Sequence, residues 1–263
     1  MPEERKELNS IIYGPVPSWR LGRSLGVDLL STAGKVCCFD CIYCQLGRTT
    51  HRTITRREFV SLGELSPELR TAQGVAADWV TFSGMGEPTL ASNLGQAIEL
   101  ARETLRLPIA VLTNSALMVR AEVRQELAKA DLIVAKLDAP NEQLFRRINH
   151  PVRQISLAEV LEGIKLFKAE YQRRLALQLM FVDENRDQAQ ELAQLVREVS
   201  PDEVQLNTPL RPCPVRPLSP EEMSGIKQEF EGLESLVVMV YEAPKPEVTP
   251  FDLEQTLRRR LKL

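Results

Sequence analysis

The chain has 263 residues, of which 43% are hydrophobic and 26% are charged, which excludes a disordered, collagen-like or coiled-coil protein. Lys and Arg number 33 and Asp and Glu number 36, so the formal charge is −3 and no overall positive charge favours nucleic acid. The start, MPEERKELNS, is polar, and no apolar run reaches the about 18 residues of a membrane helix. We therefore expect a cytoplasmic protein that does not enter a membrane.

Short apolar runs alternate along the chain with segments of helical periodicity. Six successive βα units predict a parallel sheet with helices outside it, either an open doubly wound sheet or a partly closed TIM-type barrel. Residues 236–241 predict a further strand, and the proline-rich residues 243–250 predict a linker. The six predicted strands cover residues 24–30, 79–83, 109–113, 132–137, 175–182 and 204–207, and the predicted helices cover residues 62–74, 94–105, 119–129, 156–170, 187–199 and 219–231.

Four of the five cysteines lie in one short segment, on the loop that follows the first predicted strand: Cys37, Cys38, Cys41 and Cys44. In a cytosolic protein of this size, such a group favours metal binding or catalysis over disulfides. Three interpretations are open: a redox dithiol of Cys41 and Cys44, a zinc site completed by His51, and three thiolates holding three irons of a [4Fe–4S] cluster. Structural zinc usually takes two separated ligand pairs, and a dithiol leaves Cys37 unexplained.

The spacing Cys37-x-x-x-Cys41-x-x-Cys44, with Tyr43 before the last cysteine, resembles the signature of radical S-adenosylmethionine (radical SAM) enzymes. The stretches YGPVPSWRLGRSLGVDLL, CIYCQLGRT and TFSGMGEPTL resemble an iron–sulfur oxidoreductase subgroup related to the wyosine tRNA-base enzymes. The resemblance implies a partial (βα)6 TIM-type barrel over residues 12–214, followed by a C-terminal extension over residues 215–263. It also implies that the three cysteines hold a [4Fe–4S] cluster whose open iron binds S-adenosylmethionine.

The resemblance further implies contacts to S-adenosylmethionine from a glycine-rich turn after the second strand. Gly84 and Gly86 let the backbone approach the ligand, and Glu87 is expected to pair with the methionyl ammonium. Met85 stands where the family commonly has adjacent glycines. Tyr43 is the aromatic side chain that the resemblance places beside the adenine.

Strand alternation selects further candidates inside the barrel. Lys136 and Asp138 share one face near the end of their strand, where the family often places contacts to the ribose or carboxylate of S-adenosylmethionine. Asn114, at the end of the preceding strand, is assigned the same cofactor-binding role. The alternatives are pairing with neighbours for the charged residues and strand capping for Asn114. Inward candidates without an assigned role are Asp28, Gln178 and Asn207.

The implied activity is reductive cleavage of S-adenosylmethionine to methionine and a 5′-deoxyadenosyl radical, which abstracts hydrogen from an unassigned substrate. The cofactor supplies this chemistry, and an electron donor such as flavodoxin or ferredoxin supplies the electron. Cys213, just past the sixth strand, is a candidate for returning a hydrogen atom to the substrate radical, the alternative being a small residue in a proline-rich loop. Cys38 lies outside the matched spacing and is interpreted as a bystander, the alternative being a substitute ligand.

We expect a small-molecule, peptide or protein substrate. The wyosine relatives are longer and carry extra cysteines for a second cluster, and this chain has no cysteine before Cys37 and no long basic stripe. The alternatives are a tRNA-base-modifying enzyme of wyosine type and a zinc-stabilised binding module without catalysis.

Overall fold

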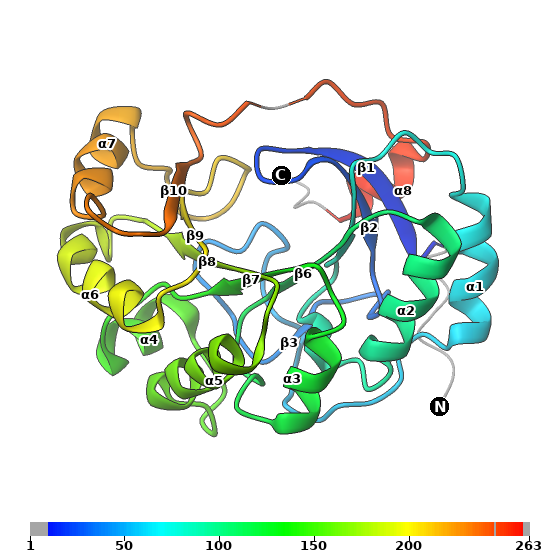
Figure 1. Ribbon diagram of the computed structural model, residues 1–263, viewed down its shortest axis with the longest axis horizontal. Helices are drawn as coiled ribbons and strands as arrows, with labels where there is room; N and C mark the ends of the chain where they lie inside the picture. The colour runs from blue at the N-terminus through cyan, green and yellow to red at the C-terminus, as the bar shows by residue number, and fades with distance from the viewer. Residues whose placement is uncertain (1–9, 245, 260–263) are drawn as a thin grey trace.

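Eight strands form one curled sheet in the computed structural model, which describes residues 10–244 and 246–259 (Figure 1). Only the first pair, β1 and β2, is antiparallel, and every later strand is parallel to its neighbour. The spatial order follows the chain order without the reversal of a doubly wound sheet, so the predicted partial TIM-type barrel is confirmed. In this order the strands are β1 (Ile12–Ser18), β2 (Gly22–Val27), β5 (Trp79–Phe82), β6 (Ile109–Thr113), β7 (Leu132–Lys136), β8 (Arg174–Met180), β9 (Glu203–Asn207) and β10 (Leu236–Met239).

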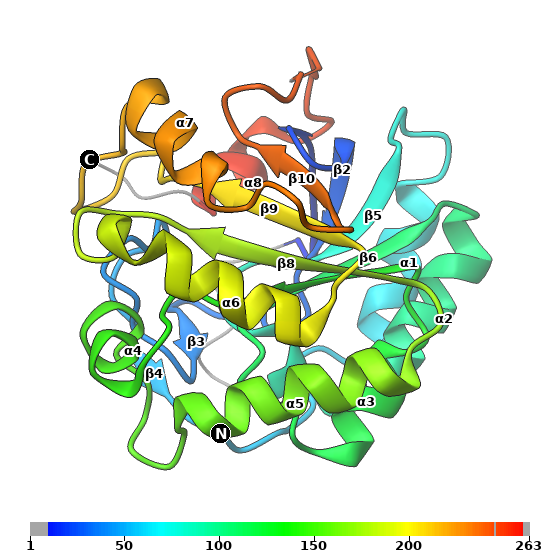
Figure 2. The same cartoon turned by 60° about the vertical axis from the view of Figure 1, so that its left-hand side comes forward.

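Helices cover the outside of the curled sheet (Figure 1, Figure 2). Both predicted capping boxes are present, Ser156 with Glu159 and Ser219 with Glu222. The helices are α1 (Leu62–Thr71), α2 (Leu94–Leu105), α3 (Ala121–Leu127), α4 (Glu142–Asn149), α5 (Leu157–Glu170), α6 (Ala189–Val199), α7 (Pro220–Gln228) and α8 (Leu253–Arg258), with 3₁₀ turns at Pro88–Leu90 and Arg186–Gln188. Two short strands, β3 (Val36–Cys37) and β4 (His51–Arg52), pair outside the main sheet.

Three of the differences from the sequence prediction concern β1, α4 and the end of β2. The edge strand β1 was not predicted, since its two prolines weaken the strand pattern, although an edge tolerates them. Helix α4 was not predicted because its segment EQLFRRIN is mostly polar, yet Asn141 caps it through the amide of Leu144. The strand predicted over residues 24–30 ends at Val27, and the chain leaves the sheet at Asp28.

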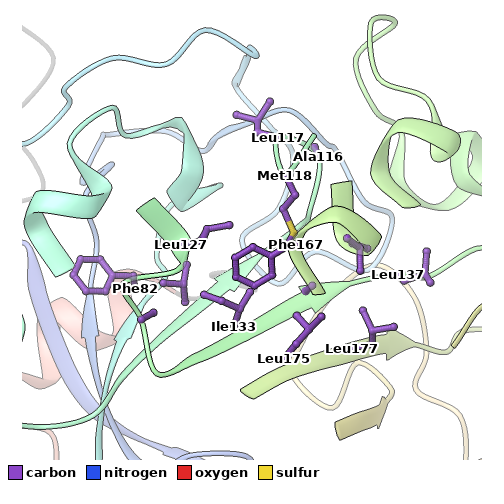
Figure 3. Packing of buried hydrophobic residues seen from close by; sticks show 14 of the residues in the cluster. Phe82, Ala116, Leu117, Met118, Leu127, Ile133, Leu137, Phe167, Leu175 and Leu177 are labelled. Atoms are coloured by element: carbon purple, nitrogen blue, oxygen red, sulfur yellow. The ribbon is translucent and has the colours of Figure 1, made fainter. Parts of the chain in front are cut away.

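The main core lies between the sheet and the helices. Figure 3 shows Phe82, Ile133 and Leu175 from the strands together with Leu127 and Phe167 from α3 and α5. All five are fully buried, and each such side chain contributes about 1.5–3 kcal/mol relative to an exposed position. The apolar outer face of the sheet is therefore what holds the barrel strands in place.

The inner face of the sheet is polar toward the carboxyl ends of its strands. Ser24 and Thr81 hydrogen bond across β2 and β5 at 2.6 Å, and Lys136, Gln178 and Gln205 are neighbours on β7, β8 and β9. A small apolar group closes the opposite end of the barrel: Leu21, Ala110, Leu132, Val134 and Ala176. Polar side chains thus gather at the end of the barrel where the cysteine loop lies, although the buried Glu203 lies at the opposite, amino end of β9.

The described part of residues 215–263 completes the fold. It supplies α7, adds β10 to the sheet beside β9 and packs α8 against β1 (Figure 1). The domain boundary after residue 214 stays a prediction. Within the described ranges, no helix combines the length and apolarity needed to cross a bilayer.

Candidate active site

The cysteine loop is held against the end of α4. The amides of Asp40 and Ile42 donate to the carbonyls of Asn149 and Ile148, each at 3.0 Å. The amide of Cys44 donates to the carbonyl of Cys41, which forms a tight turn between these two cysteines. The unpredicted helix α4 is therefore the support on which the loop is built.

Three cysteines lie near the ammonium of Lys35. Burial opposes the charge of this ammonium, but the negative potentials of Cys44, Cys37 and Cys41 outweigh that effect and raise the pKa of Lys35. Cys41 and Cys44 are half-buried and line a cavity of about 410 Å³. Its other lining residues are Asp40, Ile42, Gly47, Arg48, His150, Glu184, Pro214 and Val215. Three cysteines near one cation, two of which line an open space, fit a [4Fe–4S] cluster with a free iron.

Cys38 differs from its neighbour Cys37. A hydrogen bond from the Cys38 thiol and the charge of Lys35 together lower the pKa of Cys37 despite its burial. Burial raises the pKa of Cys38 well above its ordinary value. Burial also raises the pKa of the predicted ligand Cys41, to about 12, so these shifts do not separate ligands from bystanders. The assignment of Cys37 as a ligand and Cys38 as a bystander stays a prediction.

Among the described residues, no group of three His, Cys, Asp or Glu side chains is arranged to hold a single ion. His51 is exposed on β4. An iron–sulfur cluster needs a wider arrangement, because each thiolate binds a different iron atom. This geometry does not choose between the cluster and the zinc alternative, and the choice stays a prediction here.

The glycine-rich turn lies directly beside the first cysteine. The carbonyl of Met85 accepts from the amide of Val36 at 2.9 Å, and the amide of Glu87 donates to the carbonyl of Val36 at 3.1 Å. A Cβ on Gly86 would lie 1.6 Å from that carbonyl oxygen, and a Cβ on Gly84 would lie 2.1 Å from Cγ of Asp28. Both glycines also have positive φ, so the turn requires glycine at each position.

Glu87 is buried behind this turn. Its carboxylate accepts from the amide and hydroxyl of Thr89, the hydroxyl of Thr113 and the amide of Asn114, at 2.7–3.1 Å. Burial raises the pKa of Glu87, and these hydrogen bonds oppose the shift. Glu87 therefore ties the turn to the end of β6, while its pairing with a methionyl ammonium stays a prediction.

Asn114 connects that strand end to the cysteines. Its side-chain amide donates to the sulfurs of Cys37 and Cys38 at 3.4 and 3.1 Å, and its oxygen accepts from the amide of Ala116. Asn114 thus lies against the predicted cluster ligand Cys37. A contact to S-adenosylmethionine from this residue stays a prediction.

Tyr43, Lys136 and Asp138 form one hydrogen-bonded group. The Tyr43 hydroxyl donates to Asp138, and the Lys136 ammonium donates to the same hydroxyl at 3.1 Å. Asn149 donates to Asp138 at 2.8 Å, and the second Asp138 oxygen accepts from the amide of Met180. Burial raises the pKa of Tyr43 well above its ordinary value. The structure thus brings together three predicted site residues.

Asn149 is the member of this group that sequence analysis missed. It is the last residue of α4, and its side chain also reaches the sulfur of Cys41 at 3.5 Å. The sequence did contain a signal for α4, namely the cap residue Asn141 followed by two apolar residues at helical spacing, Leu144 and Ile148.

The remaining candidates lie on two sides of the barrel mouth. Gln178 and Asn207 are on the inner face, and Asp28 lies at the end of β2 beside Met85. Cys213 follows β9, donates to the carbonyl of Val215 at 3.2 Å and packs with the apolar group around the cysteine loop. Its predicted role in hydrogen-atom return stays a prediction.

Comparisons with known proteins agree with this geometry. The family model described as the radical SAM superfamily matches residues 32–196. UPF0026 protein MJ1312 of Methanocaldococcus jannaschii is 36% identical over 224 residues, which cover 82% of this chain and 69% of that protein. UPF0026 protein slr1464 of Synechocystis is 41% identical over 207 residues, which cover 78% of this chain and 77% of that protein.

Solved structures share the fold at low sequence identity. Streptococcus suis SuiB bound to S-adenosylmethionine is 14% identical with a TM-score of 0.63, covering 83% of this chain and 50% of SuiB. TYW1 with a lysine–pyruvate adduct is 16% identical with a TM-score of 0.60, covering 80% of this chain and 74% of that chain. This protein thus spans about half the length of SuiB. The match to the family model covers more than half of the chain and includes the cysteine loop and the glycine-rich turn, so this chain belongs to the radical SAM superfamily, whose members use a [4Fe–4S] cluster and S-adenosylmethionine.

Proposed function

We propose that the protein is a radical SAM enzyme in which Cys37, Cys41 and Cys44 hold the [4Fe–4S] cluster. When bound and reduced, the cluster supplies an electron that cleaves S-adenosylmethionine and so generates the radical that takes hydrogen from a substrate. The observation that carries the proposal is the direct backbone pairing of the glycine-rich turn with Val36, the residue before Cys37. This pairing keeps the predicted cofactor turn and the predicted cluster ligand side by side.

The protein's own residues provide placement and shielding. Lys35 places a positive charge near the three thiols, and a hydrogen bond from Cys38 together with this charge lowers the pKa of Cys37. Gly84 and Gly86 leave the turn without side chains, so backbone groups are available to the methionyl end of S-adenosylmethionine. Lys136 lies 4.5 Å from the centre of the Tyr43 ring and is only partly buried, so its ammonium is available to a carboxylate or ribose hydroxyl.

The substrate is proposed to be a small molecule, peptide or protein. A flavodoxin or ferredoxin is proposed to supply the reducing equivalents. The net charge of −3 supports this choice over tRNA, because tRNA binding draws on many Lys and Arg contacts to phosphates.

The test compares four single cysteine variants after anaerobic reconstitution with iron and sulfide. Cys37→Ala, Cys41→Ala and Cys44→Ala should each lose most bound iron and the broad visible absorption of the cluster. Cys38→Ala is the matched control, because it removes a buried thiol from the same loop, and it should retain both. Wild-type protein with reductant should form 5′-deoxyadenosine from S-adenosylmethionine, measured by chromatography. A wild type that binds no cluster, or a loss of iron in Cys38→Ala but not in Cys37→Ala, contradicts the proposal.

A further inference from the structure

The C-terminal helix is attached to the first strand of the sheet. The amide of Phe251 donates to the carbonyl of Gly14 at 2.9 Å, and the amide of Gly14 donates to the hydroxyl of Thr256 at 3.0 Å. Figure 1 shows α8 beside β1, so the two ends of the described chain meet at this edge of the barrel. The helix thereby brings its following residue, Arg259, to the carboxyl end of β2.

Arg259 forms a buried ion pair there with Asp28. Its Nε lies 3.1 Å from Oδ2 of Asp28, and the two side chains are 3% and 1% exposed. The guanidinium also donates to the carbonyl of Ser10 at 2.6 Å and stacks 4.5 Å from the centre of the Tyr13 ring. A buried charge pair is costly to desolvate, and removing one partner leaves the other charge without compensation. Arg259 is therefore the counter-ion of Asp28 and holds its side chain in place.

Asp28 in turn holds the glycine-rich turn. The same Oδ2 atom accepts from the amide of Met85 at 3.1 Å, while Oδ1 accepts from the amides of Leu30 and Ser31. The backbone of Gly84 also packs against the Asp28 side chain, since a Cβ there would lie 2.1 Å from its Cγ. One carboxylate thus links the end of β2, the cofactor turn and the C-terminal helix.

We infer that Arg259 is a positioning residue of the S-adenosylmethionine site, which acts from the C-terminal helix through Asp28 on the backbone of Met85. This inference rests on the proposed function, which assigns the contact with S-adenosylmethionine to this turn. Coupling between two sites is reciprocal, so S-adenosylmethionine must also strengthen the attachment of α8. The cofactor site then includes a contribution from residue 259, beyond the 32–196 segment that the family model matches.

The experiment uses the full chain, reconstituted anaerobically, as wild type, Arg259→Gln, Arg259→Lys and the control Arg124→Gln. Arg124 is a matched control because it is also a buried arginine that joins two elements, through Glu170 and the carbonyl of Met118, away from the turn. Equilibrium dialysis measures the dissociation constant of S-adenosylmethionine. We expect a loss of affinity on the order of tenfold for Arg259→Gln, within the typical span of about 5- to 150-fold for coupled sites, and a smaller loss for Arg259→Lys. Arg124→Gln should stay within about twofold of wild type, since residues far apart with no shared partners act independently.

The reciprocal effect gives a second measurement that does not depend on turnover. Amide hydrogen exchange over residues 250–259 should slow when S-adenosylmethionine binds to wild type, and the slowing should be largely lost in Arg259→Gln. Equal affinities in wild type and Arg259→Gln would overturn the inference. If Arg259→Gln does not fold, the test is amide hydrogen exchange in wild type. An exchange rate in α8 that does not change at saturating S-adenosylmethionine then overturns the inference. A wild type that retains its cluster but binds no S-adenosylmethionine overturns the proposed function and the inference together.

Discussion

The role of Glu87 can be tested by removing its carboxylate. In Glu87→Ala, the buried amides of Thr89 and Asn114 lose their acceptor, while the hydroxyls of Thr89 and Thr113 can rotate to other partners. Each unpaired buried amide costs about 1–3 kcal/mol, which sums to about 2–6 kcal/mol. Removal of the carboxylate also removes its desolvation cost, so we expect a loss of about 3 kcal/mol in the free energy of unfolding.

Urea unfolding of the cluster-free protein under reducing conditions, followed by circular dichroism, measures this loss. At an m-value of about 3 kcal/mol/M, the midpoint should fall by about 1 M with an unchanged slope. Glu162→Ala is the control, because Glu162 is exposed on α5 and its removal should change stability by less than about 0.5 kcal/mol. If Glu87 serves only to pair with a ligand ammonium, the affinity for S-adenosylmethionine falls and the urea midpoint does not move. A Glu87→Ala midpoint equal to that of wild type refutes the structural role.

Three other predictions concern the turn, its pH dependence and the substrate. Gly86→Ala should abolish binding of S-adenosylmethionine in dialysis, because the added Cβ meets the carbonyl of Val36, whereas Gly225→Ala in α7 has open space and should gain up to about 1 kcal/mol. Because burial raises the pKa of Glu87, this residue binds a proton more tightly in the folded protein than in the unfolded chain. The resulting contribution to the free energy of unfolding is fully present below about pH 4.3 and is lost as the pH rises through the raised pKa. Urea midpoints of wild type relative to Glu87→Gln should therefore decline over that window, and a constant difference contradicts the assignment. Incubation with methylguanosine-containing tRNA, pyruvate, S-adenosylmethionine and reductant should yield no tricyclic base by mass spectrometry, and its formation would move the tRNA alternative to first place.

Local patterns in the sequence determined most of the barrel and the cluster motif. Helical and strand periodicity reflects which face of each element is buried, so the βα units after β2 were found with their approximate bounds. The capping boxes at Ser156 and Ser219 depend on contacts three residues apart, which a sequence displays directly. The spacing of Cys37, Cys41 and Cys44 is local in the same sense.

The tertiary structure decided how distant segments complete the site. The contact of Asn149 with Asp138 depends on α4. The polar sequence of this helix gave no helix prediction, and the hydrogen bonds between its end and the cysteine loop appear only in the tertiary structure. The pairing of Arg259 with Asp28 joins residues 231 positions apart. Such contacts arise from how the curled sheet brings its two edges and the chain ends together, and neither periodicity nor motif spacing carries that information.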